Sequence, residues 1–275
     1  MILEMQQVRK TYGTTVAVDD VHLTVKRGEM VAILGPNGAG KTSTLEMVLG
    51  LRQPTSGTIR VFGSDPRDRA VRSRIGATPQ ETGYPGALRL REIGLMVASA
   101  YRRPCAIDEV FTRFGLFEMR NRVASTLSGG ELRRLNLALS FIASPEFVVL
   151  DEPTTGLDIG SRRAVWNSLR AAVDAGTTVL FSTHYLEEID ELDARVIVMD
   201  HGRICFDGTS AQMRAQISGK RISYVVDGKE EKIVSRDADA FVRDLVIRNI
   251  SFENLCIEAI RLDDAFLALT GGNAA

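Results

Sequence analysis

One short stretch of the chain combines glycine, lysine and hydroxyl residues at the spacing G-x-x-x-x-G-K-T. It comprises Gly35, Pro36, Asn37, Gly38, Ala39, Gly40, Lys41, Thr42 and Ser43. Glycines let a backbone approach an oxyanion closely with its N–H groups turned inward. A lysine at this spacing can reach β- and γ-phosphates, and the hydroxyl after it can bind Mg²⁺. A flexible glycine-rich turn is the simpler alternative. The stretch predicts a phosphate-binding loop and a nucleoside triphosphate as ligand.

Two neighbouring carboxylates follow a second apolar run of the chain. The run Phe147–Leu150 precedes Asp151 and Glu152. If the run is a buried parallel strand, both carboxylates emerge at its carboxyl end, where ligands bind in such sheets. A pair that caps the next helix is the alternative. We interpret Asp151 as a Mg²⁺ ligand and Glu152 as the general base that activates the attacking water.

A serine and two glycines precede a third segment, which has helical periodicity. Ser128 and Glu131 have the spacing of a capping box, so an ordinary helix start explains them. Gly129 and Gly130 favour a second anion site, because a close backbone–phosphate contact needs glycine and a capping box does not.

The elements that must position these groups alternate between strand-like and helical patterns, which predicts an α/β fold with a mostly parallel sheet. The expected strands are 21–25, 30–34, 58–62, 147–151, 177–182 and 195–200, with helices at 42–51, 162–174 and 186–192, among others. Short runs at 2–9 and 204–207 favour antiparallel edge strands.

Two further regions have patterns of their own. Residues from about 88 to 143 indicate a helical insertion. From about residue 220, two short strands flank Asp227-Gly228, a dipeptide typical of a tight hairpin turn. A helix at 237–248, a strand at 255–260 and a helix at 263–269 follow, so a small α/β appendage is expected. We place the domain boundary between residues 218 and 219.

Composition narrows the class of protein. The chain has 275 residues, 34 Lys and Arg against 35 Asp and Glu, and a net charge of −1, which gives no basis for nucleic acid as a partner. No apolar run reaches the length of a membrane span, and no secretory signal is expected. The cysteines are few and distant, so we expect a reduced, cytosolic protein; they are Cys105, Cys205 and Cys256.

Together, the stretches 35–42, 127–131 and 151–158 resemble, in composition and order, the nucleotide-binding subunit of an ATP-binding-cassette (ABC) transporter. The resemblance covers about residues 1–218 and implies a P-loop NTPase core with an antiparallel β subdomain. It implies four further roles: Tyr12 stacks on adenine, Gln80 senses Mg²⁺ and the attacking water, His184 contacts the γ-phosphate, and Asp158 communicates across a dimer. From the sequence alone, an ordinary strand tyrosine and a structural histidine remain alternatives for Tyr12 and His184. Glu131 departs from the glutamine most frequent in the family.

The resemblance also implies partners. Two cassettes would sandwich two ATP molecules with Mg²⁺, each between the phosphate loop of one chain and Ser128–Gly130 of the other. A homodimer is mildly favoured and a heterodimer remains open. A separately encoded integral-membrane permease would hold the pair on the cytoplasmic face of the membrane. The tail 261–271 resembles the drug- and polysaccharide-type (ABC-2-like) exporter branch, which implies export of a hydrophobic drug, antibiotic, lipid or ion; a generic amphipathic helix is the alternative.

Other classes of nucleotide-binding protein fit the sequence less well. A non-transport ABC-type ATPase of DNA repair or translation is the main rival, although the chain lacks a second cassette, C-x-x-C pairs and sustained heptads. A GTPase would be expected to carry an Asn/Thr-Lys-x-Asp run, and a kinase would lack the 127–131 motif. A scaffold that only binds ATP would be expected to have lost Glu152 or His184.

Overall fold

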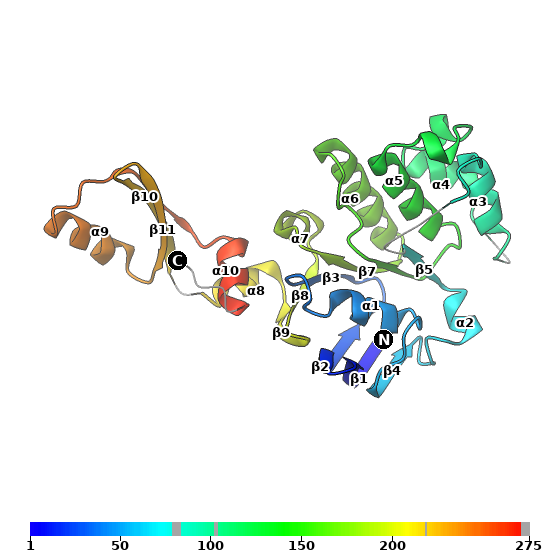
Figure 1. Ribbon diagram of the computed structural model, residues 1–275, viewed down its shortest axis with the longest axis horizontal. Coiled ribbons are helices and arrows are strands. Elements are labelled where there is room, and N and C mark those ends of the chain that lie inside the picture. Colours follow the sequence, from blue (N-terminus) through cyan, green and yellow to red (C-terminus); the bar gives the residue numbers. More distant parts are fainter. Residues whose placement is uncertain (79–83, 102–103, 218, 271–275) are drawn as a thin grey trace. The chain divides into compact units, whose positions relative to one another are not determined.

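The structure is a computed structural model that describes residues 1–78, 84–101, 104–217 and 219–270. The chain divides into two compact units, Met1–Ile204 and Cys205–Ala275 (Figure 1). The boundary placed at 218/219 from the sequence stays a prediction. None of the helices in the described ranges is long and apolar enough to cross a membrane.

A six-stranded sheet, whose last strand runs past Ile204, contains the central strands of the first unit. Its strand order is β5-β6-β7-β3-β8-β9, and the pairs from β5 to β8 are parallel. The interior strands β3, β6, β7 and β8 are buried over nearly their whole length because helices cover both faces. The bounds of all six strands are β3 Met30–Leu34, β5 Ile75–Thr78, β6 Phe147–Leu150, β7 Thr178–Thr183, β8 Arg195–Asp200 and β9 Arg203–Gly208. The predicted α/β class with a mostly parallel sheet is confirmed.

A separate antiparallel sheet packs near the N-terminus. Its order is β2-β1-β4, with β1 Leu3–Tyr12, β2 Thr15–Val25 and β4 Ser56–Val61. The expectation that residues 2–9 form an edge strand was wrong: β1 pairs on both sides and is the central strand. The second edge of β1 pairs with β4, a segment distant in the sequence, and a local pattern could not indicate that pairing. Buried residues of this sheet share one core with β3 and the helix α1 (Lys41–Val48), among them Val8, Leu45 and Ile33.

Helices lie on both faces of the parallel sheet (Figure 1). Helices α5 (Gly129–Ser140) and α6 (Ile159–Asp174) lie on one side and α1 on the other. The regular elements in the described part of 88–143 are helical, as predicted: α3 Leu90–Ala98, α4 Ile107–Arg113, two short 3₁₀ turns and α5. The first unit also contains α2 Arg69–Arg72 and α7 Leu186–Leu192.

The second unit contains the predicted hairpin. Strands β10 (Lys220–Val226) and β11 (Lys229–Ser235) are antiparallel and are joined at Asp227 and Gly228, which both have positive φ, 50° and 74°. This is the geometry that an Asp-Gly two-residue turn favours. The rest of the unit comprises α8 Ser210–Ala215, α9 Ala238–Ile247, β12 Glu253–Ala259 beside β10, and α10 Leu262–Leu269.

Candidate nucleotide-binding site

The segment between β3 and α1 is an open loop whose shape requires glycine. A side chain at Gly35 would place its Cβ 2.3 Å from the carbonyl oxygen of Met199. Gly40 has a φ of +99°, and a Cβ there would lie 2.3 Å from the carbonyl oxygen of Ala17. Positive φ and close backbone approach are both conditions that glycine alone meets without strain. The loop ends at the N-terminus of α1, where backbone N–H groups are free to bind an anion.

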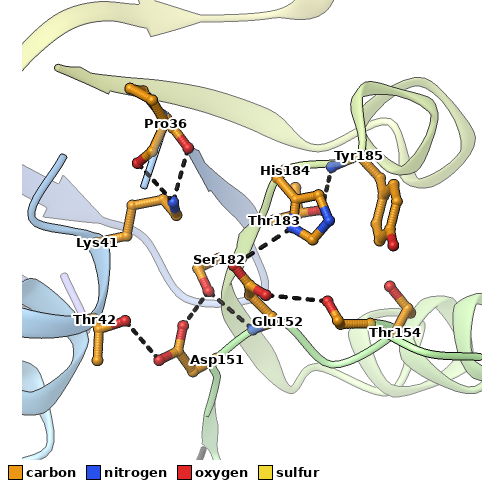
Figure 2. Close-up of polar contacts among 12 residues, drawn as sticks. Pro36, Lys41, Thr42, Asp151, Glu152, Thr154, Ser182, Thr183, His184 and Tyr185 are labelled. Atoms are coloured by element: carbon orange, nitrogen blue, oxygen red, sulfur yellow. Dashed lines mark hydrogen bonds and ion pairs between the residues drawn. The ribbon is translucent and has the colours of Figure 1, made fainter. Parts of the chain in front are cut away.

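Lys41 lies across this loop and is almost completely buried. Its Nζ donates to the carbonyl oxygen of Gly35 at 2.7 Å. It also donates to that of Pro36 at 3.1 Å (Figure 2). Burial lowers the pKa of Lys41, while the carboxylates of Glu152 and Asp151 act in the opposite direction. Phosphate oxygens at the loop would add negative charge and stabilise the ammonium form.

Asp151 is the first residue after β6 and is held from two neighbouring elements. Its Oδ2 accepts a hydrogen bond of 2.9 Å from Thr42 Oγ1 on α1, and its Oδ1 accepts one from Ser182 Oγ on β7 (Figure 2). The parallel register pairs Leu150 with Phe181, so the residues after them also lie side by side. The structure therefore brings the start of α1 into contact with the carboxylate that follows β6.

Glu152 is held in an unusual backbone conformation. Its φ is +48°, in the left-handed region that costs a non-glycine residue about 1–3 kcal/mol. Its N–H donates to Ser182 Oγ at 2.9 Å, and its carbonyl oxygen accepts from Arg133 Nη2. Its carboxylate oxygen Oε1 lies 3.4 Å from His184 Nδ1 (Figure 2). The other oxygen, Oε2, accepts from Thr155 Oγ1 at 3.1 Å.

Tyr12 lies at the end of β1, close to the start of α1. Its Oη is 3.5 Å from Ser43 Oγ, and the residue is 41% exposed. The ammonium of Lys10 lies 5.1 Å from its ring centroid. The side chain is therefore close to the loop before α1, and the residue is partly accessible.

The helix start at Ser128 has the full capping box. Ser128 Oγ accepts from the Glu131 N–H at 3.2 Å, and Glu131 Oε2 accepts from the Ser128 N–H at 2.7 Å. Arg122 Nη1 donates to Glu131 Oε1 at 2.8 Å. The Ser128 N–H, with help from Arg122, holds the pKa of Glu131 below its usual range, so the carboxylate is charged but turned back into the cap.

Asp158 caps the following helix, α6. Its two carboxylate oxygens accept from the N–H of Ser161 at 2.9 Å and from the Ser161 hydroxyl at 2.7 Å, and these bonds lower its pKa. Both Asp158 and Ser128 are exposed. Among the described residues, no hydrogen bond or ion pair joins residues 128–131 or 158 to the phosphate loop.

One predicted residue falls outside the described ranges, and two residues that contact the site were not predicted. Gln80 lies outside the described residues. The sequence interpretation assigned no role to Ser182 or Arg133, although both contact the Asp151–Glu152 segment. For Ser182, the available signal was its place at the end of the next parallel strand. No local signal pointed to Arg133, because the contact joins a helix and a loop distant in the sequence.

With this geometry established, comparison with known proteins identifies the family. The family model described as "ABC transporter" matches residues 18–155. The chain is 42% identical to the daunorubicin/doxorubicin resistance ATP-binding protein DrrA of Streptomyces peucetius, over 78% of this chain and 67% of that protein. The chain belongs to the ABC transporter family. As an ABC-type ATPase, it binds and hydrolyses ATP.

Other relatives extend the match. The cassette is 37% identical to the daunorubicin resistance ATP-binding protein DrrA3 of Streptomyces coeruleorubidus over 95% of this chain and 93% of that protein. A solved ATP-binding subunit of an ABC transporter aligns with a TM-score of 0.71 at 28% identity, covering 78% of this chain and 93% of that one. A dimeric bacterial ABC transporter cassette shares the fold, with a TM-score of 0.69 at 24% identity over 76% and 98% of the two chains.

Proposed function

We propose that the chain is the ATP-hydrolysing subunit of an exporter and drives a separate membrane permease from the cytoplasmic face of the membrane. The observation that carries the ATPase chemistry is one connected set of polar contacts, from Thr42 through Asp151 and Ser182 to Glu152 and His184. Export is supported by the relatives, which include drug-resistance proteins and a Nod factor export ATP-binding protein of Cupriavidus pinatubonensis, 40% identical over 75% of this chain.

The residues around the loop fit ATP with Mg²⁺. Thr42 Oγ1 and Asp151 Oδ2 are 2.9 Å apart, and both are the oxygen ligands that Mg²⁺ prefers. The described residues contain no group of three or more His, Cys, Asp or Glu that could hold a metal without help, which suits an ion that shares its ligands with substrate phosphates. When bound, Mg²⁺ would neutralise charge that develops on the phosphates.

Each side chain then has a defined task. Lys41 and the loop N–H groups bind the β- and γ-phosphates, and Tyr12 stacks on the adenine. Glu152 accepts the proton of the attacking water, while His184 holds the γ-phosphate. Gln80, which lies outside the described residues, is assigned the sensing of Mg²⁺ and the attacking water.

Two cassettes are required for a complete site. We place Ser128, Gly129 and Gly130 of one chain on the ATP bound at the phosphate loop of the other, with Asp158 at the dimer contact. The exposure of Ser128 and Asp158 supports this arrangement, because both are available to a partner. Loss of the γ-phosphate contacts after hydrolysis would open the pair and move the permease.

The Glu152→Gln variant provides the test. We expect it to bind ATP and dimerise, with turnover lowered by at least about 10²-fold, because the amide cannot accept the proton. Near wild-type phosphate release would refute the general-base role.

The same variant, tagged and purified from gently solubilised source-cell membranes with ATP and Mg²⁺, tests the partner. Stoichiometric recovery of a polytopic membrane protein is the expected result. Recovery of ribosomal or DNA-repair proteins alone would instead support a non-transport ATPase.

A further inference from the structure

Arg133 on helix α5 contacts the two residues at the centre of the site. Its Nη2 donates to the carbonyl oxygen of Asp151 at 3.0 Å and to that of Glu152. The side chain is half-buried, and its Nε has no hydrogen-bond partner among the described residues. Burial lowers the pKa of Arg133, against the opposing effect of the Glu152 and Asp151 carboxylates. A half-buried cation with an unpartnered donor lowers stability, so a contribution to function would explain its presence.

The Glu152 backbone needs support from outside its own segment. Its left-handed φ of +48° is disfavoured for a residue with a side chain. Ser182 binds the N–H on one side of this residue and Arg133 binds the carbonyl on the other. The two contacts together fix the direction in which the Glu152 side chain leaves the backbone.

The two side chains that bind the Glu152 backbone lie on different elements of the fold. Ser182 lies at the end of β7, in the same rigid sheet as Asp151. Arg133 lies on α5, roughly one and a half turns beyond the Ser128 cap where the helix begins. Through Arg133, the position of the Ser-Gly-Gly helix therefore bears directly on the Glu152 backbone of the same chain.

We propose that Arg133 is a positioning residue that orients the Glu152 carboxylate for hydrolysis by holding the carbonyl groups of Asp151 and Glu152. This inference rests on the proposed role of Glu152 as general base. Arg133 itself need not touch ATP or water. Its removal should therefore lower the rate of the chemical step and leave ATP binding nearly unchanged.

The test compares ATP hydrolysis by full-length variants. We expect Arg133→Met to lower kcat by about tenfold or more, with less than a twofold change in KM for ATP. Arg133→Lys should recover part of the loss, because an ammonium can still donate to a carbonyl. The matched control is Arg113→Met. Arg113 is likewise an arginine whose pKa burial lowers and which donates to a backbone carbonyl, that of Ser168 at 2.7 Å, away from the site. Equal falls in kcat for the two methionine variants would overturn the proposal.

A double-mutant cycle separates this inference from the function on which it rests. In a Glu152→Gln background, Arg133→Met should change the residual rate, measured by single-turnover hydrolysis over hours, by less than twofold. The same fold loss in both backgrounds would show that Arg133 acts independently of the carboxylate and would overturn the inference alone. Near wild-type turnover by Glu152→Gln itself would instead overturn the general-base role.

If Arg133→Met does not fold, as judged by thermal unfolding, Arg133→Lys carries the test. A fall in its kcat at constant KM, absent in Arg113→Lys, supports the proposal, and unchanged kinetics refute it.

Discussion

Substitution of Ser182 by alanine removes one hydroxyl that serves both carboxylate residues. Ser182 is completely buried, donates to Asp151 Oδ1 and accepts from the N–H of Glu152 at 2.9 Å. Asp151 is itself only 9% exposed, so water cannot readily replace the lost donor.

The expected cost follows from these two bonds. A hydrogen bond to a charged group contributes about 1.5–3 kcal/mol, and a buried N–H without a partner costs about 1–3 kcal/mol. The two effects share one site and are not fully additive. We therefore expect Ser182→Ala to lower the free energy of unfolding by about 2–4 kcal/mol. If about 1.4 kcal/mol of this also affects the transition state, kcat falls about tenfold.

The assay pairs chemical denaturation with ATP turnover, and Ser140→Ala is the control. Ser140 is also buried, but its hydroxyl donates to the Leu137 carbonyl of its own helix at 2.7 Å. Its loss should cost less than about 1 kcal/mol and leave kcat unchanged. If Ser182→Ala matches Ser140→Ala in both stability and turnover, the reasoning that Ser182 supports the carboxylate pair is refuted.

Two further predictions concern charges outside the centre of the site. Arg122→Gln should raise KM for ATP by about two- to fivefold, because the charge of Glu131 is then no longer balanced. Adding Glu131→Gln to this variant should restore the original KM. Equal KM values for the single and double variants would contradict the prediction. Glu146 is paired with Arg74 and Arg27, whose hydrogen bonds lower its pKa from 4.5 to about 2. The charged Glu146 carboxylate stabilises the fold above pH 4.5, and this stabilisation is lost as the pH falls towards 2. Because the side chain is 42% exposed, solvent screening limits the contribution to about 1 kcal/mol. The measurement is the free energy of unfolding of Glu146→Gln and of the wild type, at pH 7 and between pH 4.5 and 2. A difference in stability that persists at pH 2 would contradict the prediction.

The appendage shows how far local patterns extend. The Asp227-Gly228 turn and its flanking strands were predictable because the turn geometry depends on two residues that tolerate positive φ. The helix and strand that follow were placed to within a few residues for the same reason: their periodicity is local. By contrast, the position of β1 between β2 and β4 depends on a pairing with a segment far along the chain.

The conformation of Glu152 marks the limit of the sequence interpretation at the site. The pattern around it identified an acidic residue after a buried strand, but nothing in the pattern indicated a left-handed φ. That conformation is maintained by Ser182 and Arg133, which lie on different elements. A local sequence window cannot contain contacts of this kind.

By itself, the sequence determined the phosphate loop, the carboxylate pair and the Ser128 cap, because each depends on short-range requirements. The loop needs glycine where φ is positive or the backbone is crowded. The cap needs a hydroxyl and a carboxylate at the spacing of one helical turn. Only the tertiary structure decided how these parts are joined. The parallel register of β6 and β7 brings Ser182 beside Asp151, and the packing of α5 directs Arg133 to the carbonyl groups at the end of β6. Burial and long-range pairing set these contacts, and both are properties of the folded chain rather than of any segment within it.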